Sequence, residues 1–176
     1  MTSRNGVKNS TKSNMYERTL EGTWGLFGDY LKGAREALLC VVSAFPLSQR
    51  ATEALQSSFA QLGYGKAACT FVALRGNGLV DGTPEGGMPG GNMPVLGEKE
   101  VSAVIEGLDP LLLVIADKTA CEACSKAYRQ KIPLDQRSRV LGREVRAFSS
   151  FEAMLDDPQA KKAAWMLLKS LPKFDA

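Results

Sequence analysis

Four short strand-like runs, three of them mainly apolar, are separated by segments of helical character and limit most strongly what this chain can fold into. The runs occupy residues 37–45, 67–75, 110–117 and 142–148. Short runs of mainly apolar residues are typical of strands buried on both faces of a sheet. Segments with helical spacing of apolar residues fall at 48–63, 98–107, 119–130 and 158–171. Strands that alternate with helices predict a mostly parallel sheet, joined by right-handed crossovers and covered on both faces.

These elements predict an α/β fold, a three-layer α/β/α sandwich with a four-stranded, mostly parallel sheet. We expect the spatial order 2-1-3-4, numbering the four runs along the chain, because this order puts a topological switch point beside the first strand. Residues 15–36 repeat large apolar side chains at helical spacing and predict an extra N-terminal helix, weakened by Gly22, Gly25 and Gly28. A chain of 176 residues suits one domain, which we place at 15–176.

The segment before this domain, residues 1–14, is a short basic tail. It contains Arg4, Lys8 and Lys12 and no acid. The chain has 22 Lys and Arg residues and 19 Asp and Glu residues, so the domain keeps 19 of each and the net charge of +3 comes from the tail. A neutral domain is unlike a dedicated DNA-binding domain, which carries a basic excess. The polar tail is expected to be flexible, either as a solubilising leader or as a tether that orders on a partner.

A glycine-rich segment at residues 76–97 interrupts the alternation. It holds eight glycines and three prolines, and it leaves the second predicted strand at its carboxyl end. Long structureless loops inside compact domains are uncommon, and this edge of an open sheet is where ligands bind. The segment is therefore either a lid over a ligand or an insertion without one.

The sequence contains no histidine, which excludes several kinds of site. Ser-His-Asp hydrolysis, Cys-His nucleophiles and His-ligated zinc all need that side chain. We expect no catalytic residues, no cofactor and no metal site. Neither a secretory signal nor a membrane-length apolar run occurs, and four irregularly spaced cysteines fit a reducing compartment, so we expect a cytoplasmic protein.

Polar residues follow the predicted strands at their carboxyl ends and are the candidate ligand-binding residues. They are Ser43, Arg75, Asn77, Asp117, Lys118 and Ser149. Carboxyl ends of parallel strands meet at one edge, so these side chains could form a polar crevice. Ser48, Asp117, Ser149 and Ser150 have an alternative role as helix caps, and Ser149 with Glu152 matches a capping box.

A Cys-x-x-Cys pair, Cys121 and Cys124, lies in the predicted helix 119–130. Its spacing suits thiol redox chemistry, but a reactive thiol also needs stabilisation as thiolate, and Asp117 and Glu122 oppose this. Zinc would need two further ligands, and the remaining cysteines lie singly in predicted strands. The third interpretation is that both thiols are core residues on the inward face of the helix.

Seven cations between residues 126 and 146 form a basic stretch. We expect an anionic partner or nucleic acid at Lys126, Arg129, Lys131, Arg137 and Arg139, with Arg143 and Arg146 nearby, at the amino edge of the sheet. A solvated connecting loop is the alternative.

Two segments together resemble a known family. The first, "LLCVVSAFPLSQRATEALQSSFAQLG" followed by "ACTFVAL", has a buried strand, a Phe-Pro exit, a helix and a second strand; the second is "SSFEAMLDDPQAKKAAWMLLKSL". In this order they resemble the psi subunit of bacterial DNA polymerase III. That family has the uracil-DNA-glycosylase-like fold without its chemistry, so the resemblance implies this fold here.

The resemblance also implies a function. Glycosylases of this fold place an acid or Asn in the turn after the first strand and a His-Pro-Ser-like motif after the last, whereas this chain has Ser43-Ala44-Phe45-Pro46 and Phe148-Ser149-Ser150. In the psi family a flexible N-terminal segment docks to the clamp loader and the body meets another subunit. We therefore expect a non-catalytic accessory protein of bacterial DNA replication or repair, with a protein partner. The alternatives are a small-molecule-binding enzyme using the crevice and a thiol redox protein using Cys121 and Cys124.

Overall fold

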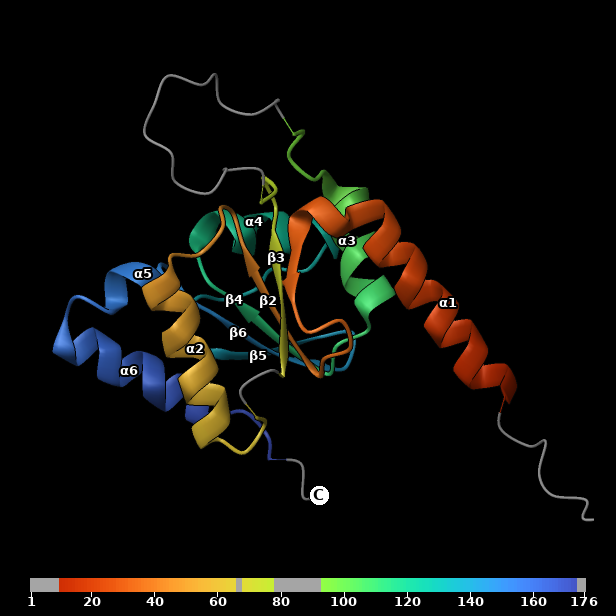
Figure 1. The fold of residues 1–176 in the computed structure, drawn as a ribbon. Helices are drawn as coiled ribbons and strands as arrows, with labels where there is room; N and C mark the ends of the chain where they lie inside the picture. Colours follow the sequence, from red (N-terminus) through yellow and green to blue (C-terminus); the bar gives the residue numbers. More distant parts are fainter. Residues whose placement is uncertain (1–9, 66–67, 78–92, 174–176) are drawn as a thin grey trace, which may run out of the picture.

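The computed structural model describes residues 10–65, 68–77 and 93–173. The chain forms a mixed α/β fold in which one sheet lies between two groups of helices (Figure 1). The elements in order are α1 Ser10–Phe27, the 3-10 turn η1 Gly28–Tyr30, β1 Leu31–Gly33, β2 Leu39–Ser43, α2 Gln49–Gln61, β3 Cys69–Ala73, α3 Glu98–Leu108, β4 Leu112–Ile115, α4 Lys118–Ala127, β5 Arg137–Val140, β6 Arg143–Ala147, α5 Phe151–Met154 and α6 Pro158–Lys169.

The sheet has the order β1-β3-β2-β4-β6-β5. Its four central strands are parallel, and they are the four predicted strands in the predicted order. The prediction of only four strands was wrong, because β1 pairs antiparallel with β3 at one edge and β5 pairs antiparallel with β6 at the other. Both edge strands are short and largely exposed, so neither has the apolar run by which a buried strand is recognised.

The predicted helix 15–36 also needs correction at both ends. α1 begins at Ser10, inside the predicted tail, and ends at Phe27. Gly28 then opens η1, and β1 follows within the range predicted as helix. Residues 1–9 of the predicted tail lie outside the described residues, as do residues 78–92 of the glycine-rich segment.

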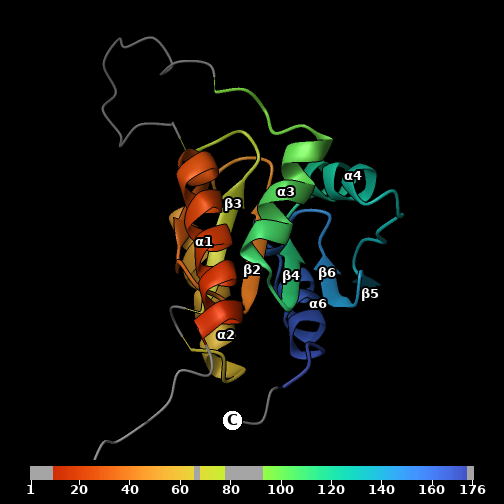
Figure 2. The same ribbon diagram turned by 90° about the vertical axis from the view of Figure 1, so that its right-hand side faces the viewer.

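Helices α1, α3 and α4 cover one face of the sheet and α2, α5 and α6 cover the other (Figure 1), and Figure 2 looks onto the face that carries α1 and α3. β2 is buried along its whole length, and its side chains alternate between the two cores. Cys40 and Val42 pack with α1, α3 and α4, whereas Leu39 and Val41 pack with α2, α5 and α6. This burial on both faces explains why β2 is continuously apolar.

Close packing joins α1 to α3. A Cβ atom added at Gly107 of α3 would lie 2.0 Å from the hydroxyl oxygen of Thr23, so only glycine permits this approach. Trp24 of α1 also donates a hydrogen bond from its ring nitrogen to the Arg35 carbonyl at 3.0 Å. α1 is thereby fixed to the domain through its C-terminal half.

Three of the four residues with a predicted alternative role as helix caps take that role. Ser48, Asp117 and Ser150 cap α2, α4 and α5 with side-chain oxygens that accept backbone N–H groups, and Asp157 caps α6 in the same way. The predicted capping box was wrong: Ser150 caps α5, Ser149 is exposed, and the Glu152 carboxylate accepts from the N–H of Ser48 at 2.8 Å. In the described part of the chain, no helix is long and apolar enough to cross a membrane.

Candidate functional site

Asp117 is the centre of the predicted crevice, and both of its carboxylate oxygens are engaged by backbone. One oxygen accepts from the N–H of Ala120 at 2.8 Å and so caps α4. The other accepts from the N–H of Ala44 at 2.8 Å, in the turn that follows β2. Asp117 also forms a β-bridge with Ser150, and the N–H of Lys118 donates to the Ser149 carbonyl at 3.0 Å. Asp117 therefore ties together three segments that leave the sheet at this edge.

The other candidate residues near β2 and β3 are also held by local contacts. The Ser43 hydroxyl is buried and donates to the Phe45 carbonyl at 2.6 Å. The Arg75 guanidinium lies over the Phe45 ring, 4.6 Å from its centroid. The backbone N–H of Asn77 donates to the Asp29 carbonyl at 2.7 Å, while its buried side-chain amide nitrogen has no hydrogen-bond acceptor among the described residues.

The predicted crevice is divided into separate cavities. Ser43 and Asn77 line a cavity of about 540 Å³ beside α2. Asp117 lines one of about 220 Å³ between the turn after β2 and the start of α5. Lys118 lines a third, of about 400 Å³, between α4 and residues 131–134. Arg75 and Ser149 line none of these three, so the six candidate residues do not converge on one ligand.

The Cys-x-x-Cys pair belongs to the core. Cys121 and Cys124 are both buried on the inward face of α4, and neither forms a disulfide. Burial raises the pKa of the Cys124 thiol to about 12 and raises that of Cys121 as well, so both remain protonated at neutral pH. A protonated thiol is a poor nucleophile and a poor metal ligand. Among the described residues, no three Cys, Asp or Glu side chains are grouped as a metal site would need.

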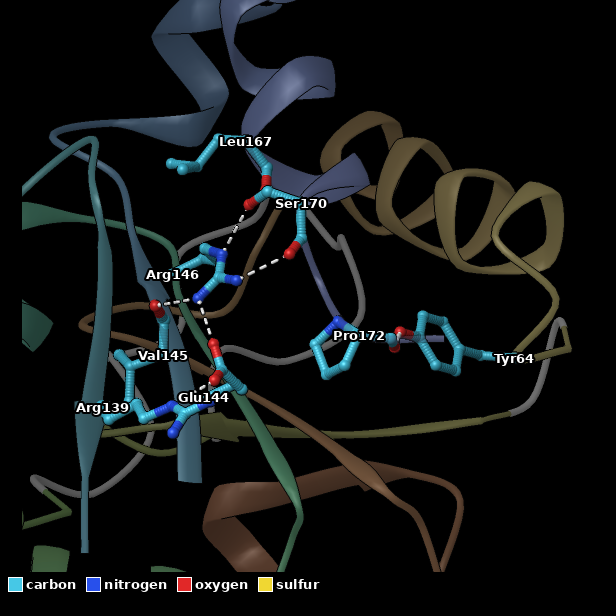
Figure 3. A network of polar contacts seen from close by, with 8 residues as sticks. All are labelled: Tyr64, Arg139, Glu144, Val145, Arg146, Leu167, Ser170 and Pro172. Carbon is cyan, nitrogen blue, oxygen red and sulfur yellow. Dashed lines mark hydrogen bonds and ion pairs between the residues drawn. The ribbon is translucent and has the colours of Figure 1, made fainter. Parts of the chain in front are cut away.

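Two arginines of the predicted basic stretch serve the fold, and sequence reasoning missed this. Arg146 of β6 is fully buried and reaches the end of α6 (Figure 3). It donates to the hydroxyl and the carbonyl oxygen of Ser170, at 2.8 Å each, and to the Val145 carbonyl at 2.8 Å. It also contacts the Glu144 carboxylate at 3.0 Å, and Arg139 pairs with the other oxygen of that carboxylate. Alternation within β6 was the available signal, because it places residue 146 on a covered face.

Arg143 forms a second ion pair at the amino edge of the sheet. It binds both oxygens of Glu106, at 2.6 and 3.1 Å, and one oxygen of Asp109 at 3.1 Å. Its Nε–H donates to the Pro110 carbonyl at 2.8 Å, and the Tyr128 hydroxyl donates to Glu106 at 2.8 Å. The hydrogen bonds from Arg143 are the main reason that the pKa of Glu106 is lowered. This cluster joins β6 to the end of α3.

The five cations proposed for nucleic acid are exposed but do not form one row. Arg139 lies on the α6 side of the sheet, where it meets Glu144, and Arg137 follows the same alternation. Lys126 is on α4, which covers the opposite face. The predicted position at the amino edge was also wrong in part, because Arg137 pairs with Arg146 near the carboxyl end of β6.

The cavity at Lys118 is a groove that the sequence did not indicate as a site. It lies between α4 and the extended segment 131–134, and Cys121, Ile132, Pro133 and Leu134 supply apolar lining. The signal in the sequence was the apolar Ile-Pro-Leu segment between two predicted elements, where a solvated loop would be polar.

No protein-family model and no curated protein matches this chain. A function is therefore argued from the sequence, the fold and the contacts above.

Proposed function

We propose that this chain is a non-catalytic interaction protein of the bacterial cytoplasm, an accessory component of a DNA replication or repair assembly. The observation that carries the proposal is the pair of hydrogen bonds that the Asp117 carboxylate accepts from the backbone. Its two oxygens are occupied by the N–H groups of Ala120 and Ala44, so the one acid at the centre of the carboxyl edge acts as a brace. A general acid or base must reach a proton of the substrate, whereas the two oxygens of Asp117 are directed at backbone N–H groups of two separate segments.

The likeness to the psi subunit family supports the assembly. Both of the segments that carry it form the expected elements, with β2, α2 and β3 in the first and α5 and α6 in the second. In the turn after β2, Ala44 and Phe45 stand where a glycosylase would need an acid or an amide. The partner proposed from this likeness is a clamp loader, bound through the basic N-terminal segment.

The test is co-sedimentation of the full chain with the clamp-loader complex of the same organism. The matched control is a chain that starts at Ser10, which lacks Arg4 and Lys8 and keeps all of α1. We expect a complex with the full chain and weaker binding by the control, with no release of uracil from uracil-containing DNA. Separate sedimentation of chain and clamp loader would contradict the assembly, and base release would contradict the non-catalytic function.

A second candidate function is the binding of a small molecule in the cavity beside α2. The buried amide nitrogen of Asn77, which has no acceptor among the described residues, favours it, because such a donor is costly to leave unpaired. Thermal shift with a panel of small carboxylates and nucleotides tests this function, with Asn77→Ala as the variant. Stabilisation that is lost in the variant supports it, and an unchanged melting temperature with every compound contradicts it.

A further inference from the structure

The groove between α4 and the segment 131–134 has the size and lining of an anchor site for a side chain. Its volume of about 400 Å³ lies near the small end of the range of roughly 300–1,000 Å³ for ligand pockets. Cys121 and Ile132 are buried in its base, and Pro133 and Leu134 are half-buried along one wall. An apolar base of this kind suits one or two apolar side chains of a partner.

Hydrogen bonds fix the segment 131–134 against α4, so the groove is already formed in the chain without a partner. The N–H of Ile132 donates to the Ser125 hydroxyl at 3.1 Å, and the Cys121 thiol donates to the Ile132 carbonyl at 3.4 Å. Beyond the groove, the N–H of Asp135 donates to the Ala147 carbonyl at 2.7 Å and attaches the segment to β6. A preformed groove loses little conformational entropy on binding.

The rim of the groove is basic. Lys118, Lys126 and Lys131 are exposed around it, against the single carboxylate of Glu122. Lysines around an apolar pocket attract a partner that combines acidic and apolar groups. None of the residues that line the groove is aromatic. Single-stranded nucleic acid binds by stacking its bases on such rings, so a protein segment fits this groove better.

We propose that this groove binds an acidic peptide segment of a partner protein, with a large apolar side chain of that segment in the pocket and its carboxylates against Lys118, Lys126 and Lys131. This inference rests on the proposed interaction function, for which it supplies a surface on the folded domain. It also gives Cys121 a positioning role, because its thiol holds the Ile132 carbonyl in the wall of the groove.

Selection from a phage-displayed random dodecapeptide library against the full chain tests the chemistry without assuming a sequence. We expect enriched peptides in which Asp or Glu flank a large apolar residue. The best peptide, labelled with fluorescein, then gives an affinity by anisotropy, and amide chemical shifts locate its site. Shifts concentrated in residues 118–134 support the inference. Neutral or basic peptides, no enrichment, or shifts elsewhere would overturn it.

Two matched charge-reversal variants distinguish peptide binding at the groove from a general effect of the protein's net charge. The variant Lys126→Glu/Lys131→Glu should weaken binding of the peptide about tenfold, since each exposed ion pair contributes a fewfold effect. The control Lys161→Glu/Lys162→Glu makes the same change in charge on exposed residues of α6, which covers the opposite face. Equal weakening in both variants, or a single-stranded oligonucleotide that displaces the peptide from the groove, would refute the proposal.

A variant in the wall of the groove and the clamp-loader experiment provide two further tests. Leu134→Ser should abolish peptide binding with an unchanged circular dichroism spectrum, and retained affinity would count against the pocket. If no acidic peptide binds while the clamp-loader complex forms, the groove inference fails and the proposed function stands. If acidic peptides bind the groove and the clamp loader does not, the groove stands and the proposed assembly fails.

Discussion

Replacing Arg146 by Ala should destabilise the protein more than any other change to its basic residues. The guanidinium is fully buried and donates to four acceptor atoms, on Ser170, Val145 and Glu144. Removal of one partner from a buried ion pair costs about 3–5 kcal/mol. Glu144 keeps its pair with Arg139, so the lower end applies, and we expect a loss of about 3 kcal/mol.

Urea unfolding at neutral pH measures this loss, followed by circular dichroism and by tryptophan fluorescence. In a Trp24→Phe background Trp165 of α6 is the only tryptophan, so its emission reports on the helix whose end Arg146 holds. The matched control is Arg137→Ala, which removes the exposed arginine opposite Arg146 in the sheet register and should change stability by less than about 0.5 kcal/mol.

The stability of Arg146→Lys should lie between those of the wild-type and Arg146→Ala proteins. Lysine keeps the charge but lacks the planar guanidinium that donates to Ser170 and Glu144 at the same time. Equal stability of the Arg146→Ala and Arg137→Ala proteins would refute the reasoning, since it would show that the buried contacts contribute nothing beyond an exposed arginine. A large loss with the lysine variant fully stable would show that charge alone matters.

Three further predictions concern other parts of the fold. Gly107→Ala should lower the melting temperature although alanine favours helix by about 1 kcal/mol, because the clash with Thr23 costs about 1–3 kcal/mol, and Thr23→Ala should relieve it. Glu106→Gln should make the free energy of unfolding decrease less steeply as the pH is lowered. In the fold, Arg143 lowers the pKa of Glu106. The stabilisation by this carboxylate is therefore complete above the unfolded pKa of 4.5 and is lost as the pH falls through the folded pKa. An equally steep loss of stability in acid for the wild-type and Glu106→Gln proteins would exclude this. Cys124 should react with a thiol reagent at pH 8 only after unfolding, and rapid labelling of the native protein would show an accessible thiol.

The four central strands of the sheet could be predicted because the residues that indicate each strand lie within its own short segment. β2, β3 and β4 are recognised from their apolar runs, β6 continues the alternation of strands and helices, and the order of the four follows from the crossover rule and the switch point. β1 and β5 could not be found this way, because each has one neighbour and short exposed faces. Their position is set by pairing with β3 and β6, which is a tertiary contact.

The candidate site was predicted less well, and Asp117 shows why. The sequence placed it correctly at the carboxyl edge and offered both roles, as ligand or cap. Only the geometry reveals that its second oxygen accepts from Ala44, 73 positions away in the chain. The structural role of Arg146 was missed for a similar reason. The sequence shows Arg146 only as one cation of the basic stretch, whereas its burial depends on where α6 ends.

Hydrogen exchange of the full chain, alone and with the clamp-loader complex, tests the interaction function most directly. The account predicts slower exchange in the complex at the basic N-terminal segment, through which the clamp loader is proposed to bind, and unchanged exchange in β6 and α6, whose contacts serve the fold. Unchanged exchange throughout the chain, or protection confined to the carboxyl-edge residues around Asp117, would contradict it.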